Sequence, residues 1–201
     1  TAAVQAPSQI AFTVKVHGKA SHAGFAPQDG VHAIRIAAAA IAEMAIGRIG
    51  DDTTVNVGRI EGGRASNIVP DYCEVSGELR SFSHEKALEE LAKVEQIFAK
   101  EAEKRGGSIE FIRDICYQAY KTDEKESVVK EFQKACTACG IKSSLIATFG
   151  GSDQNKMSEH GIPGIVMASA MHQVHSCQEY TEVSEMAQVA GIVSELLQMK
   201  E

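Results

Sequence analysis

Residues 68–105 read IVPDYCEVSGELRSFSHEKALEELAKVEQIFAKEAEKR, and this stretch contains the two periodicities that decide the fold. Its first half alternates small or apolar residues with polar ones, which predicts a strand over 68–82 with one buried face. Its second half repeats apolar residues at helical spacing from Leu88 to Phe98, which predicts a helix over 84–105. A strand followed directly by an amphipathic helix indicates a domain in which helices cover a sheet.

The segments on either side extend this pattern to six elements. Alternation over 9–17 and a β-rich run over 53–60 predict strands, and residues 108–116 predict a further strand. Small apolar residues at helical spacing predict a helix over 28–48. The resulting β-α-β-β-α-β order is typical of the ferredoxin-like arrangement, an antiparallel sheet with both helices on one face. We therefore predict an α+β domain over 9–116.

Residues 117–201 instead alternate helices with short apolar strands, as in an α/β fold. The expected elements are a helix over 123–139, a strand over 143–147, a short helix over 154–160, a strand over 164–168 and a helix over 184–199. Two short strands make only a thin sheet. We therefore expect this second domain to contain part of a larger α/β sandwich.

The composition excludes several classes of function. The 201 residues are 44 % hydrophobic and 23 % charged, with a formal net charge of −7. The negative charge and the lack of a Lys/Arg cluster argue against a nucleic-acid partner. No apolar stretch approaches the length of a membrane span, and the first residues do not form a signal peptide. Five cysteines make no even framework, so we expect reduced thiols and a cytoplasmic location.

Residues 18–30, GKASHAGFAPQDG, form a polar loop punctuated by glycines. His22 lies among small residues that leave its ring free, and an imidazole is suited to proton transfer or hydrogen-bond donation. The alternative is an ordinary histidine of a surface loop. The loop alone does not decide between the two.

Two further candidates follow strands of the second domain, where α/β folds place ligands. His172 and His175 share one loop with Glu179, and a carboxylate near a histidine can orient a zinc ligand. Two histidines in one loop also fit a polar surface loop. Residues 150–153, GGSD, could approach a ligand through their backbone or serve as a helix cap.

Arg80 lies on the polar face of the strand predicted over 68–82. Its guanidinium could bind a carboxylate through two hydrogen bonds. The alternative is an ion pair with Glu74 or Glu78, which share that face. Asn67 belongs to the polar segment that precedes this strand.

Five motifs, taken in order, resemble the dinuclear-zinc exopeptidase and amidohydrolase family, which includes carboxypeptidase G, acetylornithine deacetylase and peptidase T. They lie at residues 18–30, 65–71, 77–81, 150–153 and 175–180. Each motif is modest, but five in the right order across nearly the whole chain are specific. The Met-His-Gln-Val-His-Ser run is most similar to the peptidase T-like branch.

The resemblance implies a zinc-bearing α/β catalytic domain with an inserted ferredoxin-like domain that mediates dimerisation. Residues 9–116 would be this dimerisation (lid) domain, and residues 117–201 the C-terminal segment of the catalytic domain. His175 would be a zinc ligand, and His22 would polarise the scissile carbonyl, often in the partner's site. No metal role passes to His172. The substrate-binding residues implied are Asn67, Arg80, Gly151 and Ser152.

The sequence departs from the family because it has no His-x-Asp motif, and its Glu-Glu pair lies within a charged helix. We therefore expect a fragment without the N-terminal half of the catalytic domain, inactive by itself. Its parent would bind two zinc ions, form a homodimer through the ferredoxin-like domain, and hydrolyse short peptides as a peptidase T-like aminopeptidase. The alternatives are an amidohydrolase or deacetylase of acyl-amino acids, a non-catalytic dimerisation module, or a small-molecule-binding regulatory domain.

Overall fold

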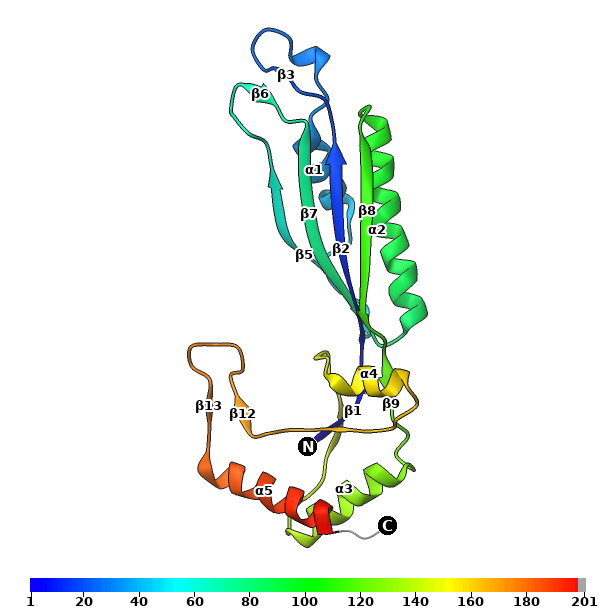
Figure 1. The fold of residues 1–201 in the computed structure, drawn as a ribbon, viewed down its shortest axis with the longest axis vertical. Helices are drawn as coiled ribbons and strands as arrows, with labels where there is room; N and C mark the ends of the chain where they lie inside the picture. Colours follow the sequence, from blue (N-terminus) through cyan, green and yellow to red (C-terminus); the bar gives the residue numbers. More distant parts are fainter. Residues whose placement is uncertain (199–201) are drawn as a thin grey trace. The chain divides into compact units, whose positions relative to one another are not determined.

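The computed structural model describes residues 1–198, which divide into two compact units (Figure 1). Residues Pro7–Ala119 form the first, named here the ferredoxin-like unit. The second, named the α/β unit, joins Thr1–Ala6 to the chain from Tyr120 onward. The α/β unit is therefore discontinuous in sequence, with the ferredoxin-like unit inserted between its segments. No helix among residues 1–198 has the length and apolar character needed to cross a bilayer.

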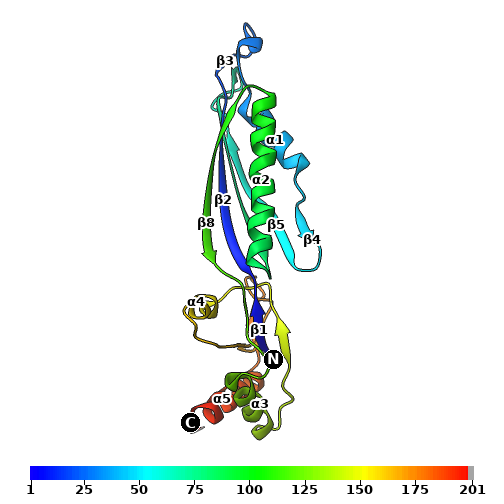
Figure 2. The same ribbon diagram turned by 90° about the vertical axis from the view of Figure 1, so that its right-hand side faces the viewer.

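The ferredoxin-like unit is built on one five-stranded antiparallel sheet in the order β4-β5-β7-β2-β8. Helices α1 (Ala33–Glu43) and α2 (His84–Lys104) cover the same face of this sheet (Figure 2). The chain order β2-α1-β5-β7-α2-β8 confirms the fold predicted from the sequence. The strands are β2 (Ser8–His17), β4 (Gly47–Ile49), β5 (Thr53–Gly62), β7 (Tyr72–Ser81) and β8 (Ser108–Tyr117).

Side-chain alternation decides which face of this sheet the helices cover. On β2, Ile10 and Val14 are 0 % exposed and belong to the same core as Phe98 of α2. The alternate residues, such as Thr13 and Lys15, are less buried and pair across strands, as where Lys15 Nζ lies 3.2 Å from Glu110 Oε1. Each buried side chain of this size contributes about 2 kcal/mol. The register is therefore strongly fixed, because a slip of one residue would expose the whole apolar set.

Helix α1 is shorter than the helix predicted over 28–48. Residues Pro27–Asp29 form a separate 3-10 turn, η1, before it. After the helix, Gly47 adopts φ +95° and starts strand β4, which pairs with β5. A helix cannot include a residue in that conformation. The apolar periodicity thus continues beyond both ends of the helix that the backbone forms.

The strand predicted over 68–82 is interrupted at Pro70, where β6 (Ile68–Val69) ends before β7 begins. Proline has no N–H for a strand ladder. The Pro70 carbonyl instead accepts a hydrogen bond of 2.8 Å from Ala33 N–H at the start of α1. Strand β6 pairs with β3 (Ser21–His22) in a two-stranded sheet of its own.

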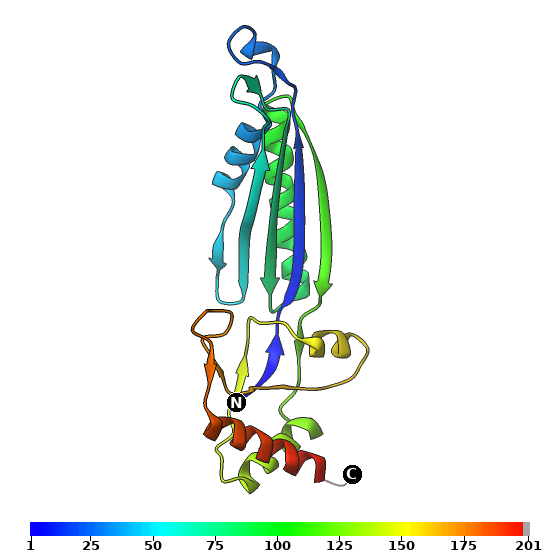
Figure 3. The ribbon, with the colours of Figure 1, turned by 60° about the vertical axis from the view of Figure 1, so that its left-hand side comes forward.

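The α/β unit has a small sheet centred on β1 (Ala2–Ala6). Strand β1 pairs in parallel with β10 and antiparallel with β9 and β11. Helices α3, α4 and α5 and the hairpin β12–β13 complete the unit (Figure 3). Their bounds are β9 (Tyr120–Lys121), α3 (Ser127–Ala138), β10 (Leu145–Ala147), α4 (Asp153–Glu159), β11 (Val166–Met167), β12 (Met171–His172), β13 (Tyr180–Thr181) and α5 (Val183–Gln198).

Strand β1 has no signal in the sequence, and the expected domains over 9–116 and 117–201 leave it out. Its residues are mostly alanine, which has a weak preference for strands. Ala2 is nevertheless 0 % exposed and packs with Phe132 and Ile192 in the core of the α/β unit. Pairing on both sides therefore makes this segment a strand, against its local preference.

Candidate functional site

Strands β3 and β6 bring His22 and Asn67 together at one end of the ferredoxin-like unit (Figure 1). His22 is paired with Ile68. The next residue, Ala23, donates its N–H to the Asn67 carbonyl oxygen at 2.9 Å. Both His22 and Asn67 are exposed. This end of the unit therefore presents an imidazole and a side-chain amide from two distant parts of the sequence.

The loop after β3 fixes the orientation of the His22 ring. His22 Nδ1 accepts hydrogen bonds from Gly24 N–H at 3.1 Å and Phe25 N–H at 3.2 Å. The Phe25 ring lies against the imidazole, with 4.3 Å between centroids. A neutral imidazole whose Nδ1 is an acceptor carries its proton on Nε2. His22 thus presents an Nε2–H donor, the group needed to polarise a carbonyl oxygen.

Arg80 makes the ion pair that was the alternative interpretation of its sequence position. Its Nε donates to Glu78 Oε1 at 2.9 Å and its Nη2 to Glu78 Oε2 at 3.3 Å. These hydrogen bonds raise the pKa of the Arg80 guanidinium above its usual value. Arg80 also lies far from His22 and Asn67. Those two residues are near the Tyr72 end of β7, and Arg80 is eight residues farther along the strand, about 26 Å at the usual strand rise.

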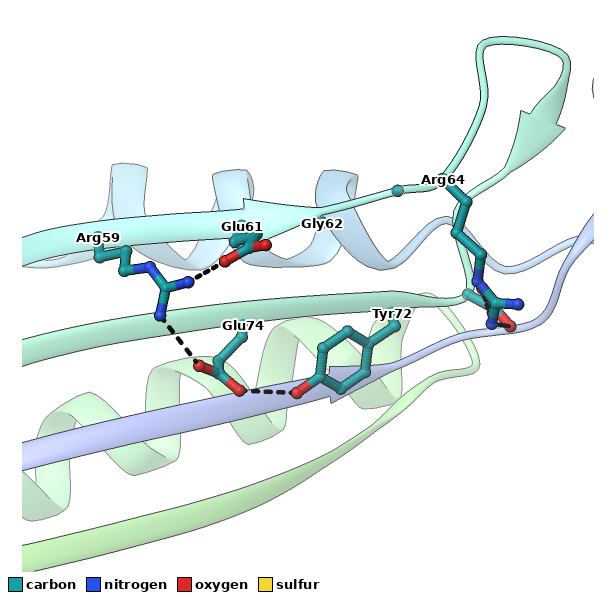
Figure 4. A pocket seen from close by; sticks show the side chains of 8 residues that line it. Arg59, Glu61, Gly62, Arg64, Tyr72 and Glu74 are labelled. Atoms are coloured by element: carbon teal, nitrogen blue, oxygen red, sulfur yellow. Dashed lines mark hydrogen bonds and ion pairs between the residues drawn. The ribbon is translucent and has the colours of Figure 1, made fainter.

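A polar pocket of about 410 Å³ lies where β5 ends and β7 begins (Figure 4). Arg59 forms ion pairs with Glu61 and Glu74 in this pocket, and the Tyr72 hydroxyl donates to Glu74 at 2.8 Å, which raises the pKa of Tyr72. Its charged side chains are thus paired with one another, and none of the six site residues expected from the sequence lines it. The lining residues are Arg59, Glu61, Gly62, Gly63, Arg64, Asp71, Tyr72 and Glu74.

Gly151 and Ser152 lie at the start of α4 in the α/β unit. The Ser152 N–H donates to Asn155 Oδ1 at 3.0 Å, and Ser152 is the N-cap of the helix. Both residues also line a pocket of about 220 Å³, beside Thr148 and Met167. The two interpretations of this motif, helix cap and wall of a cleft, are therefore compatible.

His175 lies in the hairpin β12–β13, exposed and with φ +63°. Its N–H donates to Glu179 Oε2 at 2.8 Å, so the carboxylate holds the backbone of the histidine and not its ring. Ala170 and Gln173 also adopt positive φ, +61° and +51°. A left-handed conformation costs a residue with a Cβ about 1–2 kcal/mol. The hairpin is therefore a strained segment that surrounding contacts must maintain.

Known proteins share both units of this chain. Residues 7–106 match the peptidase dimerisation domain of the M20 peptidases. The aminopeptidase PepT of Bacillus cereus is 37 % identical, with a TM-score of 0.86 over 98 % of this chain and 54 % of its own length. The chain belongs to the M20 peptidase family. A tripeptidase of Staphylococcus aureus is 31 % identical, with a TM-score of 0.92 over 98 % of this M20 chain and 52 % of its own.

The uncharacterized protein YqjE of Bacillus subtilis is 35 % identical over 97 % of this M20 chain and 53 % of its own length. The chain thus spans about half the length of the relatives that it matches. These likenesses confirm the resemblance to the peptidase T-like branch that the sequence motifs indicated.

The described part of this M20 chain does not form a complete zinc site. Residues 1–198 contain no group of three or more His, Cys, Asp or Glu side chains placed to hold a metal ion. His172 is bonded to Glu185, and Glu179 is bonded to the backbone of His175. The zinc role expected for His175 therefore needs ligands other than these residues.

The contact between His172 and Glu185 in this M20 chain is not predicted from the sequence. His172 Nε2 lies 2.5 Å from Glu185 Oε2, although the two residues belong to a hairpin and to helix α5. The only hint in the sequence is the position of Glu185 in the first turn of a predicted helix, where a carboxylate is favoured. No spacing rule connects it to His172.

Proposed function

We propose that the whole protein is a zinc-dependent peptidase T-like aminopeptidase that acts as a homodimer on short peptides. The observation that carries the proposal is the similarity of both units, over 98 % of the chain, to an aminopeptidase and to a tripeptidase. The dimerisation domain matched by residues 7–106 supports the homodimer. Five cysteines without a disulfide support a cytoplasmic location.

His22 is the residue of this chain with the clearest role in the proposed reaction. Its Nε2–H would donate to the oxygen of the scissile carbonyl and stabilise the negative charge that develops there. Asn67 would donate its side-chain amide at the same place. The two backbone N–H groups on Nδ1 support this role, because they orient the ring and leave Nε2–H as its donor. The carbonyl would lie in the site of the partner subunit.

The other proposed site residues act in substrate and metal binding. Arg80 would exchange Glu78 for a carboxylate of the substrate, and Gly151 and Ser152 would line the cleft that receives the peptide. His175 would be one ligand of two zinc ions, with the remaining ligands outside the described residues. Residues 1–198 by themselves do not complete a metal site.

Peptide hydrolysis tests the proposal. With zinc present, the whole protein should cleave tripeptides, and His22→Ala should lower kcat about 100- to 1000-fold with little change in KM. His160→Ala removes another exposed histidine and serves as the matched control. Equal rates for the two variants would exclude the proposed role of His22. Cleavage of acyl-amino acids in place of tripeptides would favour an amidohydrolase.

The isolated chain gives a second test. Residues 1–201 with added zinc should not cleave peptides faster than their His175→Ala variant does. Faster cleavage by the unmodified chain would show that its own residues suffice for activity.

A second candidate function is a dimerisation module without chemistry, which the family matched by residues 7–106 favours. Sedimentation of the chain over a range of concentrations tests dimerisation separately from peptide hydrolysis. A dimer with no hydrolysis by the whole protein would support the module alone. A strict monomer at high concentration would contradict the module and the proposed homodimer together.

A further inference from the structure

The hairpin that carries His175 has few contacts within its own ladder. Strands β12 and β13 contribute two residue pairs, Met171 with Thr181 and His172 with Tyr180. Between these pairs, Gln173 and His175 adopt left-handed conformations that disfavour any residue with a Cβ. A ladder this short does not maintain such a backbone, so contacts outside it must do so.

Hydrogen bonds at the tip of the hairpin β12–β13 define the shape of its loop. The His175 N–H donates to Glu179 Oε2 at 2.8 Å, and Ser176 Oγ donates to the Gln173 carbonyl oxygen at 2.7 Å. Both bonds join residues of the hairpin to one another. They hold the loop closed, but they do not hold it against the rest of the α/β unit.

His172 supplies that attachment. Its Nε2 lies 2.5 Å from Glu185 Oε2, and its ring stacks on Tyr180 with centroids 4.8 Å apart and an interplanar angle of 17°. Glu185 is in the first turn of α5, where the helix N-terminus favours a carboxylate. The side chains of His172 and Glu185 are 40 % and 38 % exposed, so the contact is partly shielded from water. It joins a strained loop to a regular helix of 16 residues.

We propose that His172 is a positioning residue, which fixes the conformation of the hairpin by linking it to Glu185, and thereby fixes the place of His175. The link does not depend on what His175 binds. Only the benefit of that link, a pre-oriented ligand, rests on the proposed function. This contact between His172 and Glu185, named here the tether, gives a role to His172, to which the family resemblance assigns none.

Amide hydrogen exchange of the 201-residue chain tests the tether, with the His175 N–H as reporter. His172→Phe keeps an aromatic ring against Tyr180 but has no hydrogen bond to Glu185, and Glu185→Ala removes the same bond from the helix side. Both variants should speed exchange of the His175 amide about tenfold or more. His172→Gln places an amide nitrogen near the position of Nε2 and should restore exchange to within about threefold of the original rate.

Two controls separate the tether from general destabilisation. Glu182→Ala removes a carboxylate just before α5 and should leave exchange of the His175 amide unchanged. Amides of α3, in the same unit, should be unaffected in all variants, and a variant that speeds them has unfolded the unit. Unchanged exchange in Glu185→Ala, which alters a half-buried side chain in the first turn of α5, would overturn the proposal. Equal acceleration by Glu182→Ala would overturn it as well.

A spectroscopic readout distinguishes positioning from mere stability. The His175 ring should give one set of imidazole NMR signals in the unmodified chain, doubled or broadened signals in His172→Phe, and one set again in His172→Gln. One sharp set in His172→Phe would contradict the positioning role. If the whole protein cleaves no peptide while these results hold, the proposed function fails and the tether stands.

Discussion

The two units bury apolar surface in different ways. In the ferredoxin-like unit, β2 and β7 pair along ten residues each and lie under two helices. In the α/β unit, the strands of the central sheet have two to five residues. Helix α5 also leaves Val183 and Leu197 more than four-fifths exposed, at 83 % and 82 %. The ferredoxin-like unit therefore contains its own stabilising contacts, and we expect the α/β unit to be the less stable of the two.

The largest expected effect tests whether the units unfold separately. Phe98 and Phe132 are 0 % and 1 % exposed, one in the core of each unit. Replacing a buried Phe by Ala costs about 3–5 kcal/mol. Phe98→Ala should lower the urea midpoint of the ferredoxin-like unit alone. Phe132→Ala should leave the α/β unit unfolded without denaturant, because that unit has less stability to lose.

Pulse-labelling hydrogen exchange across a urea series measures this, since peptides report on each unit individually. The two units do not unfold separately if either variant lowers the urea midpoints of both units to the same extent. The contrast between the units is sharpened if the unmodified chain already shows two transitions, with the α/β unit unfolding first.

A smaller loss is expected from the centre of the long sheet. A Cβ added to Gly77 would lie 2.2 Å from the Asn56 carbonyl oxygen and 2.4 Å from the Phe12 ring. The first neighbour is backbone, so rotating a side chain does not relieve the clash. Gly77→Ala should cost the ferredoxin-like unit about 1–3 kcal/mol in chemical denaturation.

Gly58→Ala is the matched control on the neighbouring strand. Its added Cβ would meet only Asn56 Nδ2 at 3.6 Å, an ordinary contact. A stability change within about 0.5 kcal/mol is expected for it. If the two alanine variants were equally stable, close packing at Gly77 would not be what holds β5, β7 and β2 together.

The same contrast explains how far the sequence predicts the fold. Alternation over the long strands and periodicity in α2 are strong because each element buries one continuous face, and these predict the ferredoxin-like unit correctly. The α/β unit is harder, since β1 consists mainly of alanines and becomes a strand only through pairing with β10 and β11. Local signals are weakest where partners distant in the sequence determine the structure.

The candidate site, too, depends on contacts between residues that are distant in the sequence. The residue types of His22 and Asn67 suggest chemistry, but their proximity depends on the pairing of β3 with β6, which no spacing indicates. Arg80 and Glu78 share a strand face at i and i+2, so their ion pair could be expected from alternation alone. His172 and Glu185 meet across two elements, and only the structure shows their contact.

A buried hydrogen bond gives the next effect, now in the α/β unit. Thr122 is 7 % exposed, and its Oγ1 donates to the Gly164 carbonyl oxygen at 2.5 Å. Thr122→Val keeps the shape but removes the donor, which should cost about 1–2 kcal/mol. Thr137→Val removes a hydroxyl that bonds the Gln133 carbonyl on the exposed side of α3, and it should cost less. Equal losses measured by urea denaturation would mean that burial does not strengthen the contact at Thr122.

The smallest expected effect is electrostatic and concerns the ferredoxin-like unit. Lys86 Nζ donates to Asp52 Oδ1 at 2.6 Å, and this bond, with a second from Thr53 Oγ1, holds the pKa of Asp52 below its usual value of 3.8. A carboxyl whose folded pKa is depressed stabilises the fold above its unfolded pKa. That stabilisation is lost as the pH falls through the lower folded value.

The urea midpoint of the ferredoxin-like unit should therefore fall slightly more between pH 5 and pH 2 in the unmodified chain than in Asp52→Asn. Equilibrating samples at each pH and labelling them at one fixed pH separates this from the pH dependence of exchange itself. Asp29→Asn removes an exposed carboxylate of η1 in the same unit and should leave the steeper fall in place. If Asp29→Asn flattened the profile as much as Asp52→Asn, the effect would belong to the overall charge of the unit and not to the contact between Asp52 and Lys86.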